Sequence, residues 1–331
     1  MRYRTLGSTD ISLSEVGFGC WTVSTGWWGQ VGDDEAIRLL RRAYDLGVTL
    51  FDAADTYGNG RSERQLARAF GGLRDKVVIA TKFGYDWYRY AGERRGQQEI
   101  PQDWSARHIR FACEESLKRL DTDYIDIFQM HNPKMDAIAA DEAFDALDRL
   151  KAEGKIRCYG VALGPAFGWR EEGLRALAER PIGMLQIIHN LLEQDPGRDL
   201  IEAARQRGVG VVVRVPHSSG MLEGRYTKDT TFDAGDHRSH RPRAWLSEGL
   251  QKIERLTFLT ENGRRTLGQA ALRWLFAEPA IASALPNIYK EEQLLEFAGA
   301  SDCPDLTGEE LARVADLYEH NFYLQQATAR T

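Results

Sequence analysis

The sequence predicts an α/β fold, a single (β/α)8 barrel of the TIM type with an N-terminal β-hairpin and an extra C-terminal helix. Short apolar runs, typical of strands buried on both faces, alternate along the chain with segments of helical periodicity. Such alternation implies a parallel sheet, and eight strand–helix units favour closure into a barrel. A length of 331 residues suits one barrel of ~250 residues with insertions. We therefore expect residues 1–331 to form one domain.

The N-terminal segment is expected to be the hairpin, because turn residues 7–10 join two short extended segments at 2–5 and 11–13. The first barrel strand is expected at 16–21, where two glycines permit close approach of a ligand or a neighbouring segment. The other seven strands are expected at 48–52, 77–82, 124–130, 156–162, 184–189, 209–215 and 281–285.

Helices are expected between these strands. The first is capped by Asp33 or Asp34 and ends at Gly47, with apolar residues at helical spacing between them. The last, at 307–318, opens with Thr307 and Glu310 at the spacing of a capping box. The others are expected near 62–70, 105–120, 138–153, 170–179, 199–207, 244–260, 267–277 and 290–298.

Two long loops, at 83–104 and 216–243, leave the C-terminal ends of strands, and loops of this length are usually functional or disordered. Aromatic residues in the first loop, and after the first strand, either line a pocket or pack their segments onto the barrel. As substrate-pocket candidates we select Trp21, Trp28, Trp87 and Tyr88. The second loop contains a basic run at 236–243, which either covers an anionic group or is a solvated surface.

The bulk composition excludes several classes of protein. A net charge of −6 and a pI of about 5.8 give no basic footprint for nucleic acid. The four cysteines are far apart and read as reduced thiols of a cytoplasmic protein. The N-terminal residues 1–5 lack the apolar h-region expected of a signal peptide, and no apolar run approaches the ~20 residues of a membrane span. The sequence also lacks a metal-ligand spacing of His, Cys and carboxylates, so we expect no metal site. The acidic balance permits a monomer or small homo-oligomer.

Four polar residues follow apolar strands in a way that predicts a common site. Asp52 and Lys82 end the second and third expected strands, His131 directly follows the fourth, and Tyr57 lies in the loop after the second. In a parallel barrel the C-terminal strand ends face the active site. A lone Asp or Lys after a strand is usually a solvated cap. The combined types and positions instead favour a proton-transfer set.

The four residue types suit the reduction of a carbonyl group. A tyrosine hydroxyl, with a reference pKa of ~10, is a poor acid, and a nearby ammonium makes it a better one. Lys82 is the available ammonium and Asp52 its counter-charge, so Tyr57 could donate a proton in neutral solution. A hydrogen bond from His131 to the same substrate oxygen would help, because that oxygen gains negative charge as a hydride arrives.

These residues stand in motifs that resemble those of the aldo-keto reductases, barrel oxidoreductases that use NAD(P)H. The resemblance runs nearly end to end, through residues 16–21, 51–58, 81–82, 130–133, 219–226 and 269–274. It implies that Tyr57 is the general acid, that Asp52 and Lys82 tune it, and that His131 positions the carbonyl. By the same resemblance the cofactor-binding residues are Gly19, Cys20, Trp21, Gln186, Arg214, Pro216, Ser218, Gly220, Leu222, Asn287, Lys290 and Gln293.

The sequence departs from the family pattern where the cofactor would bind. Ala162 and Leu163 stand where the family usually has a Ser-Asn pair, and Arg214 stands where it often has an aromatic residue. Phe297 replaces the usual Asn, and Lys290 is the nearby cation for a 2′-phosphate. The resemblance implies a nicotinamide cofactor, and we expect NADP(H) rather than NAD(H). Arg214 either replaces part of the missing polar contact or forms a structural salt bridge.

We therefore expect a cytoplasmic enzyme that transfers a hydride between a nicotinamide cofactor and an aldehyde or ketone, or the corresponding alcohol. An alternative is a cofactor-sensing or partner-binding barrel subunit with slow or no turnover. A third reading is a barrel isomerase or lyase that uses the same acid without a nicotinamide. The sequence identifies neither the substrate nor the direction of the reaction.

Overall fold

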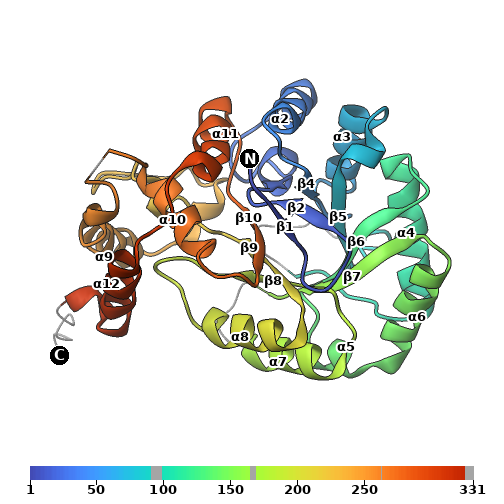
Figure 1. The fold of residues 1–331 in the computed structure, drawn as a ribbon. Helices are drawn as coiled ribbons and strands as arrows, with labels where there is room; N and C mark the ends of the chain where they lie inside the picture. The colour runs from blue at the N-terminus through green and yellow to red at the C-terminus, as the bar shows by residue number, and fades with distance from the viewer. Residues whose placement is uncertain (91–98, 165–168, 262, 325–331) are drawn as a thin grey trace.

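The computed structural model describes residues 1–90, 99–164, 169–261 and 263–324, and it forms the expected parallel barrel (Figure 1). Eight strands follow one another around the sheet in the order β10-β9-β8-β7-β6-β5-β4-β3. Their bounds are β3 Phe18–Gly19, β4 Leu50–Asp52, β5 Val78–Phe83, β6 Ile125–His131, β7 Ile156–Ala162, β8 Met184–Ile188, β9 Gly210–Arg214 and β10 Ile281–Leu285. A parallel bridge between Val16 and Ala284 brings the two ends of the sheet together, so the barrel is nearly closed.

The expected hairpin consists of β1 (Tyr3–Thr5) and β2 (Ser12–Ser14), which pair antiparallel. Its side chains Leu6, Ile11 and Leu13 are buried in one cluster with residues from the barrel strands. The hairpin therefore closes the end of the barrel opposite the C-terminal strand ends. The functional side chains are left to the other end.

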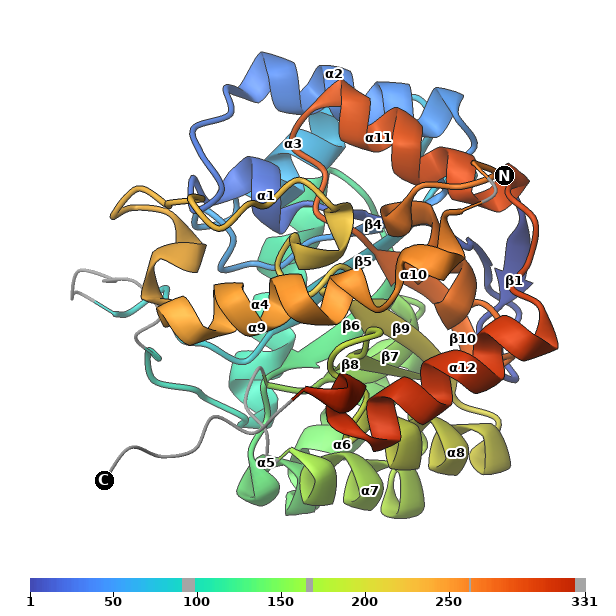
Figure 2. The same cartoon turned by 90° about the vertical axis from the view of Figure 1, so that its left-hand side faces the viewer.

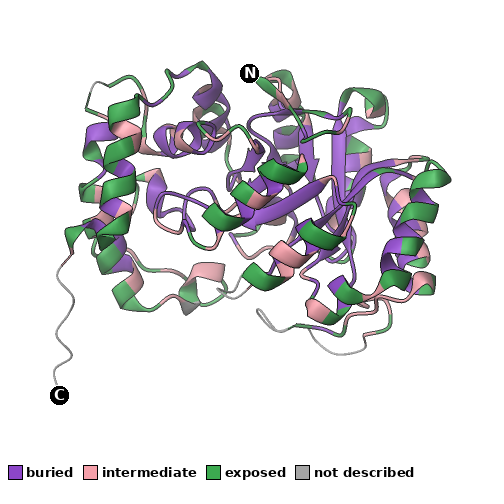
Figure 3. Ribbon diagram, turned by 60° about the horizontal axis from the view of Figure 1, so that its bottom comes forward, coloured by how far each residue is buried: buried purple, intermediate pink, exposed green. Residues whose placement is uncertain are grey.

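Helices surround the strands, with buried inner and exposed outer faces (Figure 3). Helix α11 lies beside α2 and closes the ring where the last strand meets the first (Figure 2). The bounds of the helices are α1 Trp21–Ser24, α2 Asp33–Asp45, α3 Arg61–Phe70, α4 Ala106–Leu120, α5 Met135–Ala139, α6 Asp141–Ala152, α7 Arg170–Glu179, α8 Gly197–Arg207, α9 Arg243–Glu254, α10 Leu267–Leu275, α11 Glu291–Ala298 and α12 Gly308–Glu319.

The C-terminal helix α12 begins with the expected capping box, in which Thr307 accepts from the backbone of Glu310 and the Glu310 side chain accepts in return. Its inner residues Val314 and Leu317 belong to a separate apolar cluster that also contains Leu222 from the loop after β9. Helix α12 thus supports that loop from outside the barrel. Across the described ranges, no helix combines the length and the apolar character that a membrane span requires.

Two expected elements differ from the structure. The first strand was expected at 16–21 but β3 covers only Phe18–Gly19, because Cys20 takes a helical backbone conformation and begins α1. The helix expected at 138–153 is two helices, α5 and α6, because the extended backbone of Ala140 (φ −78°, ψ 105°) interrupts it. The other expected elements agree with the structure in order and type, and their boundaries agree to within a few residues, except that the helix expected at 244–260 ends at Glu254 as α9.

Candidate active site

The structure places the four strand-end residues at the same end of three adjacent strands. Asp52 is the last residue of β4, Lys82 lies near the end of β5, and His131 is the last residue of β6. Tyr57 lies in the turn after β4, before helix α3. Because β4, β5 and β6 are neighbours in the sheet, these side chains meet at the C-terminal mouth of the barrel.

The ammonium group of Lys82 is the centre of the site. Its Nζ donates to Asp52 Oδ2 at 2.5 Å, to the Ala53 carbonyl at 2.7 Å and to the Tyr57 hydroxyl oxygen at 3.3 Å. Three N–H donors are thereby matched to three oxygens, which fixes the direction of the side chain. A hydrogen bond from an ammonium to a phenol oxygen stabilises the phenolate that proton donation would leave behind.

Lys82 keeps its charge although its side chain is completely buried. Burial acts to lower the pKa of Lys82, but Asp52 and Tyr57 act in the opposite direction and the pKa of Lys82 is raised overall. Lys82 is thus a cation in neutral solution, beside a tyrosine hydroxyl.

Two glutamine amides hold the other oxygen of Asp52. Gln129 Nε2 donates to Asp52 Oδ1 at 2.9 Å, and Gln186 Nε2 donates to the same oxygen at 3.0 Å and to Gln129 Oε1 at 3.0 Å. With Lys82 on Oδ2, both oxygens of the carboxylate accept hydrogen bonds, as suits its ionised form. Gln129 is not among the site residues expected from the sequence, although it lies two residues before His131 and so points to the same face of β6.

His131 lies between two tyrosine rings. Its ring centroid is 5.8 Å from that of Tyr57 and 5.1 Å from that of Tyr85, and both contacts are edge-to-face. The Gln102 amide donates to the backbone carbonyls of His131 and Asn132 at 3.0 and 3.1 Å. Residues at both ends of the loop after β5 thus hold the end of β6 in place.

A cavity of about 480 Å³ opens above these side chains. Asp52, Tyr57 and His131 lie in its wall. Of the residues that the resemblance assigns to the cofactor, Gly19, Trp21, Gln186, Arg214 and Asn287 also line it. Of the others, Cys20 is buried at the start of α1. The loop after β9 contains Pro216, Ser218, Gly220 and Leu222, and the start of α11 contains Lys290 and Gln293.

Arg214 is the last residue of β9, and its side chain lines this cavity. Tyr57 lines it from the loop after β4, a strand that is not a neighbour of β9 in the sheet. Burial lowers the pKa of Arg214, and the nearby Tyr57 and Asp52 oppose that change only in part. Its Nη2 donates to the backbone carbonyl of Leu163, whereas its Nε has no partner among the described residues. No ion pair of Arg214 is found within the described ranges, so the guanidinium is available to a bound ligand.

Aromatic rings form one rim of the cavity. Trp21, Trp27, Trp28 and His237 all line it, and the His237 ring centroid lies 4.8 Å from that of Trp21 and 6.0 Å from that of Trp27. His237 comes from the basic run after β9, and its backbone N–H donates to the Trp27 carbonyl at 2.8 Å. This run therefore folds over the cavity mouth and meets the segment after β3.

Trp87 and Tyr88, selected as substrate-pocket residues, are not part of this wall. Their rings stack on each other at 4.2 Å, and the Arg119 guanidinium lies over both. Arg119 also donates to the Tyr88 hydroxyl at 2.8 Å and to Glu63 at 2.6 Å. The two rings pack against the Arg119 guanidinium beside α3 and α4, away from the cavity. Trp87 and Tyr88 are therefore removed from the expected substrate-pocket residues.

The fully buried Asp55 lies near this cluster. Burial raises the pKa of Asp55 well above its ordinary value, and the neighbouring carboxylate of Glu63 adds to the effect, while Arg119 opposes it. The surroundings of Asp55 therefore favour the neutral form of its carboxyl group. Asp55 follows Asp52 by three residues, but the surroundings of the two carboxyl groups differ, because Asp52 accepts a hydrogen bond from the Lys82 ammonium.

Comparison with protein families decides the identity of this barrel. The model of the Aldo/keto reductase family matches residues 15–319. The chain belongs to the aldo/keto reductase family. An NADH-specific methylglyoxal reductase of Escherichia coli (strain K12) is 30% identical over 312 residues, which cover 91% of this chain and 93% of that protein.

Solved structures of other aldo/keto reductases have the same fold. The glycerol dehydrogenase AKR11B4 from Gluconobacter oxydans superimposes with a TM-score of 0.83 at 28% identity, covering 99% of both chains. An aldo/keto reductase from Klebsiella pneumoniae, solved in complex with NADP and acetate, gives a TM-score of 0.70 at 26% identity, covering 96% of this chain and 95% of that one. The chain is thus an oxidoreductase of this family, whose members use a nicotinamide cofactor.

The unusual cofactor positions of this aldo/keto reductase have structural explanations. Phe297 is fully buried and its ring lies 4.4 Å from that of His217, so it contributes to the core beneath the loop after β9. At the end of β7, Leu163 presents its backbone carbonyl to Arg214. A guanidinium from β9 thus reaches the place where the family usually has polar side chains on β7.

Proposed function

We propose that this aldo/keto reductase reduces an aldehyde or ketone, or oxidises the corresponding alcohol, with Tyr57 as the general acid and base. The observation that carries the proposal is the hydrogen bond from the buried Lys82 ammonium to the Tyr57 hydroxyl oxygen at 3.3 Å. A buried cation that donates to a phenol oxygen favours loss of the phenolic proton. Because Tyr57 lines the cavity, its hydroxyl proton can pass to a substrate bound there.

The proposed proton transfer follows from this geometry. Tyr57 holds its proton towards a carbonyl oxygen bound in the cavity, and His131, whose ring contacts that of Tyr57, orients the same oxygen. As the carbonyl becomes an alkoxide, Tyr57 gives its proton to the oxygen and becomes a phenolate. Lys82 stabilises this phenolate, and the Asp52 carboxylate keeps Lys82 charged. A nicotinamide cofactor held in the cavity would supply the hydride to the carbonyl carbon, so that one hydride and one proton would be added in all.

The cavity has the donors that a nicotinamide cofactor needs. Arg214 Nε and Asn287 Nδ2 are buried and have no hydrogen-bond partner among the described residues, and both side chains line the cavity. Unpaired buried donors of this kind are rare without a ligand. We propose that they hold the cofactor together with Gln186, and that the loop after β9 covers its phosphates.

The preference for NADP(H) over NAD(H) remains part of the proposal. Lys290, exposed at the start of α11, is the cation that we assign to the 2′-phosphate. The carboxylate of Glu223 is expected to weaken phosphate binding there. It accepts a hydrogen bond from the Gln293 amide at 3.1 Å, and the resemblance assigns Gln293 to the same end of the cofactor. Burial raises the pKa of Glu223 to about 7, so its negative charge is only partial in neutral solution. The expected preference for NADPH is therefore small.

The substrate is proposed to enter beside the rim formed by Trp21, Trp27, Trp28 and His237, which suits a flat or partly apolar carbonyl compound. We also propose a cytoplasmic monomer or small homo-oligomer. All four cysteines are free and buried, as expected where thiols stay reduced. The alternative of a cofactor-sensing barrel without turnover is not favoured, because the proton-transfer residues are assembled.

Titration with NADPH and NADH, followed by quenching of tryptophan fluorescence, tests the cofactor part of the proposal. Saturable quenching is expected with both, and NADPH should bind more tightly. A screen of aldehydes and ketones with the preferred cofactor should then reveal oxidation of the reduced nicotinamide. If neither cofactor binds, the proposal is wrong and an isomerase or lyase becomes the better reading.

A further inference from the structure

A second polar cluster, formed by Asp86, Asp103 and His108, lies where the loop after β5 begins and ends. None of the three lines the cavity described above. Asp86 and Asp103 are held by backbone hydrogen bonds across the loop, from Asp86 N–H to the Pro101 carbonyl and from Asp103 N–H to the Gly84 carbonyl, both 2.8 Å. The two carboxyl groups are thus brought together by the base of the loop, although they are far apart in the sequence.

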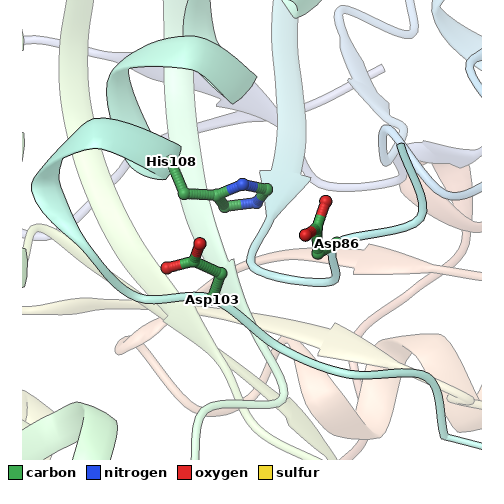
Figure 4. Close-up of side chains that lie close together, drawn as sticks. All are labelled: Asp86, Asp103 and His108. Carbon is green, nitrogen blue, oxygen red and sulfur yellow. The ribbon is translucent and has the colours of Figure 1, made fainter. Parts of the chain in front are cut away.

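The third member, His108, comes from the first turn of α4. Figure 4 shows its imidazole ring between the two carboxyl groups, with Asp86 and Asp103 approaching from the loop. One donor atom from each residue lies within 4.8 Å of the donor atoms of the other two. Zinc bonds to nitrogen and oxygen ligands of ~2.0–2.2 Å hold such atoms ~3.4 Å apart in a tetrahedral site. Small side-chain rotations would bring the three donors onto one ion.

The state of His108 points to a ligand. It is only 1% exposed, and neither ring nitrogen has a hydrogen-bond partner in the described part of the chain. Asp86 Oδ1 is also buried without such a partner. Buried polar atoms are nearly always hydrogen-bonded, so an imidazole with two idle nitrogens beside two carboxylates is an unusual arrangement. A cation bound to one ring nitrogen and to both carboxylates would give that nitrogen and the Asp86 carboxylate a partner.

We propose that Asp86, Asp103 and His108 bind a divalent first-row transition-metal ion, with Zn²⁺ as the reference ion. A neutral imidazole with two carboxylates is a nitrogen and oxygen ligand set, which suits such ions better than Ca²⁺ or Mg²⁺, whose ligands are oxygen. Burial lowers the pKa of His108, which keeps the ring in the neutral form that binds metal. Water would complete the coordination.

A competing explanation is that Arg89 already balances the two carboxylates. Its Nη1 lies 3.5 Å from Asp86 Oδ2 and 3.9 Å from Asp103 Oδ2, and its side chain is 62% exposed. Ion pairs of an exposed arginine at these distances contribute little, although Asp86 and Asp103 are themselves partly buried, and Arg89 leaves the ring nitrogens of His108 unpaired. Arg89 is therefore expected to compete weakly with the ion and to be displaced by it.

The ion would have a structural role next to the active site. Tyr85 and Gln102, the neighbours of two of the ligands, form a bridge between the two sides of the loop. Tyr85 contacts the His131 ring, and Gln102 donates to the His131 carbonyl. An ion that fastens Asp86 to Asp103 would thus hold the segment that supports His131.

The test uses the full-length protein, freed of metal with EDTA and then desalted. Titration with Co²⁺, followed by visible absorption, and with Zn²⁺, followed by calorimetry, should reveal one saturable site. His108→Gln and Asp86→Asn should each weaken Zn²⁺ binding at least about tenfold, since even outer-shell changes cost ~10–100-fold. Arg89→Gln should strengthen it, because it removes the competing charge.

The matched control is His320→Gln. His320 is an exposed histidine that lies 3.2 Å from the Asp316 carboxylate, so it offers a similar pair without burial. This variant should bind Zn²⁺ as the wild type does. Circular dichroism checks that each variant folds. If His108→Gln does not fold, the test relies on Asp86→Asn alone. The proposal is overturned if the wild type has no saturable site, or if Zn²⁺ binding survives in both ligand variants.

Discussion

Removal of the Lys82 ammonium is the perturbation whose effects the structure predicts in most detail. Lys82→Met keeps most of the volume of a side chain that is 0% exposed, but it deletes the charge that faces Asp52 at 2.5 Å. Asp52 then remains buried with two neutral partners, the amides of Gln129 and Gln186. Tyr57 loses the donor that stabilises its phenolate.

The expected loss of stability follows from the uncompensated carboxylate. Removing one partner of a buried ion pair costs about 3–5 kcal/mol. For a chain of 331 residues, an entropy of unfolding of ~2.1 cal/mol/K per residue gives ~0.7 kcal/mol/K, so Tm should fall by about 4–7 °C. The rate of carbonyl reduction should fall as well, by about 10²–10⁴-fold, the usual contribution of a positioned general acid.

Differential scanning calorimetry of the cofactor-free protein measures the first effect, and steady-state turnover the second. Lys76→Met is the matched control, because Lys76 pairs with Asp75 at 2.7 Å but both side chains are more than half exposed. It should leave Tm and turnover unchanged. The double variant Asp52→Asn/Lys82→Met should regain part of the lost stability, since it also removes the buried charge. An unchanged Tm in Lys82→Met, or a double variant less stable than the single one, would refute the reasoning.

Two further predictions concern buried carboxyl groups. The pKa of Asp55 is raised well above the ordinary 3.8 in the folded protein. Above about pH 4 the unfolded chain has released the proton of this carboxyl group, so folding must take a proton up. The free energy of unfolding therefore falls as the pH rises. Asp55→Asn should therefore be more stable than the wild type at pH 8, with a gain that shrinks towards pH 5 in urea unfolding; equal gains at both pH values would contradict this. Glu223→Gln keeps an oxygen that can accept from Gln293 but removes the charge, so it should strengthen NADPH binding severalfold and NADH binding little. Fluorescence titration would contradict the assignment of Glu223 if both affinities changed equally.

Much of the fold could be predicted from the sequence because each barrel strand is a short apolar run between helices of clear periodicity. Local signals placed even the capping box at Thr307 and Glu310 correctly. The split between α5 and α6 could not be predicted, since Ala140, where the backbone turns extended, is an ordinary helix-forming residue.

Site residues at strand ends could be predicted from the sequence. Residues whose role depends on contacts with distant parts of the chain could not. The sequence positions of Asp52, Lys82 and His131 sufficed to expect them at one mouth. Gln129 was missed because a polar residue inside an apolar strand gives no sign of its partner. Trp87 was assigned to the pocket because a loop sequence cannot tell which cation or cavity its rings will meet, and Arg119 lies in a helix far along the chain.

The central claim is that Tyr57 gives its proton to a carbonyl oxygen. Its most direct test is the rate of a single reduction in stopped flow, with cofactor-loaded wild type and Tyr57→Phe and a carbonyl substrate from the screen. Tyr57→Phe removes one hydroxyl that contacts Lys82, so the variant should fold and bind cofactor as the wild type does. Its rate of reduction should fall by about 10²-fold or more. A variant that reduces the substrate at the wild-type rate would contradict the assignment of Tyr57 as the acid.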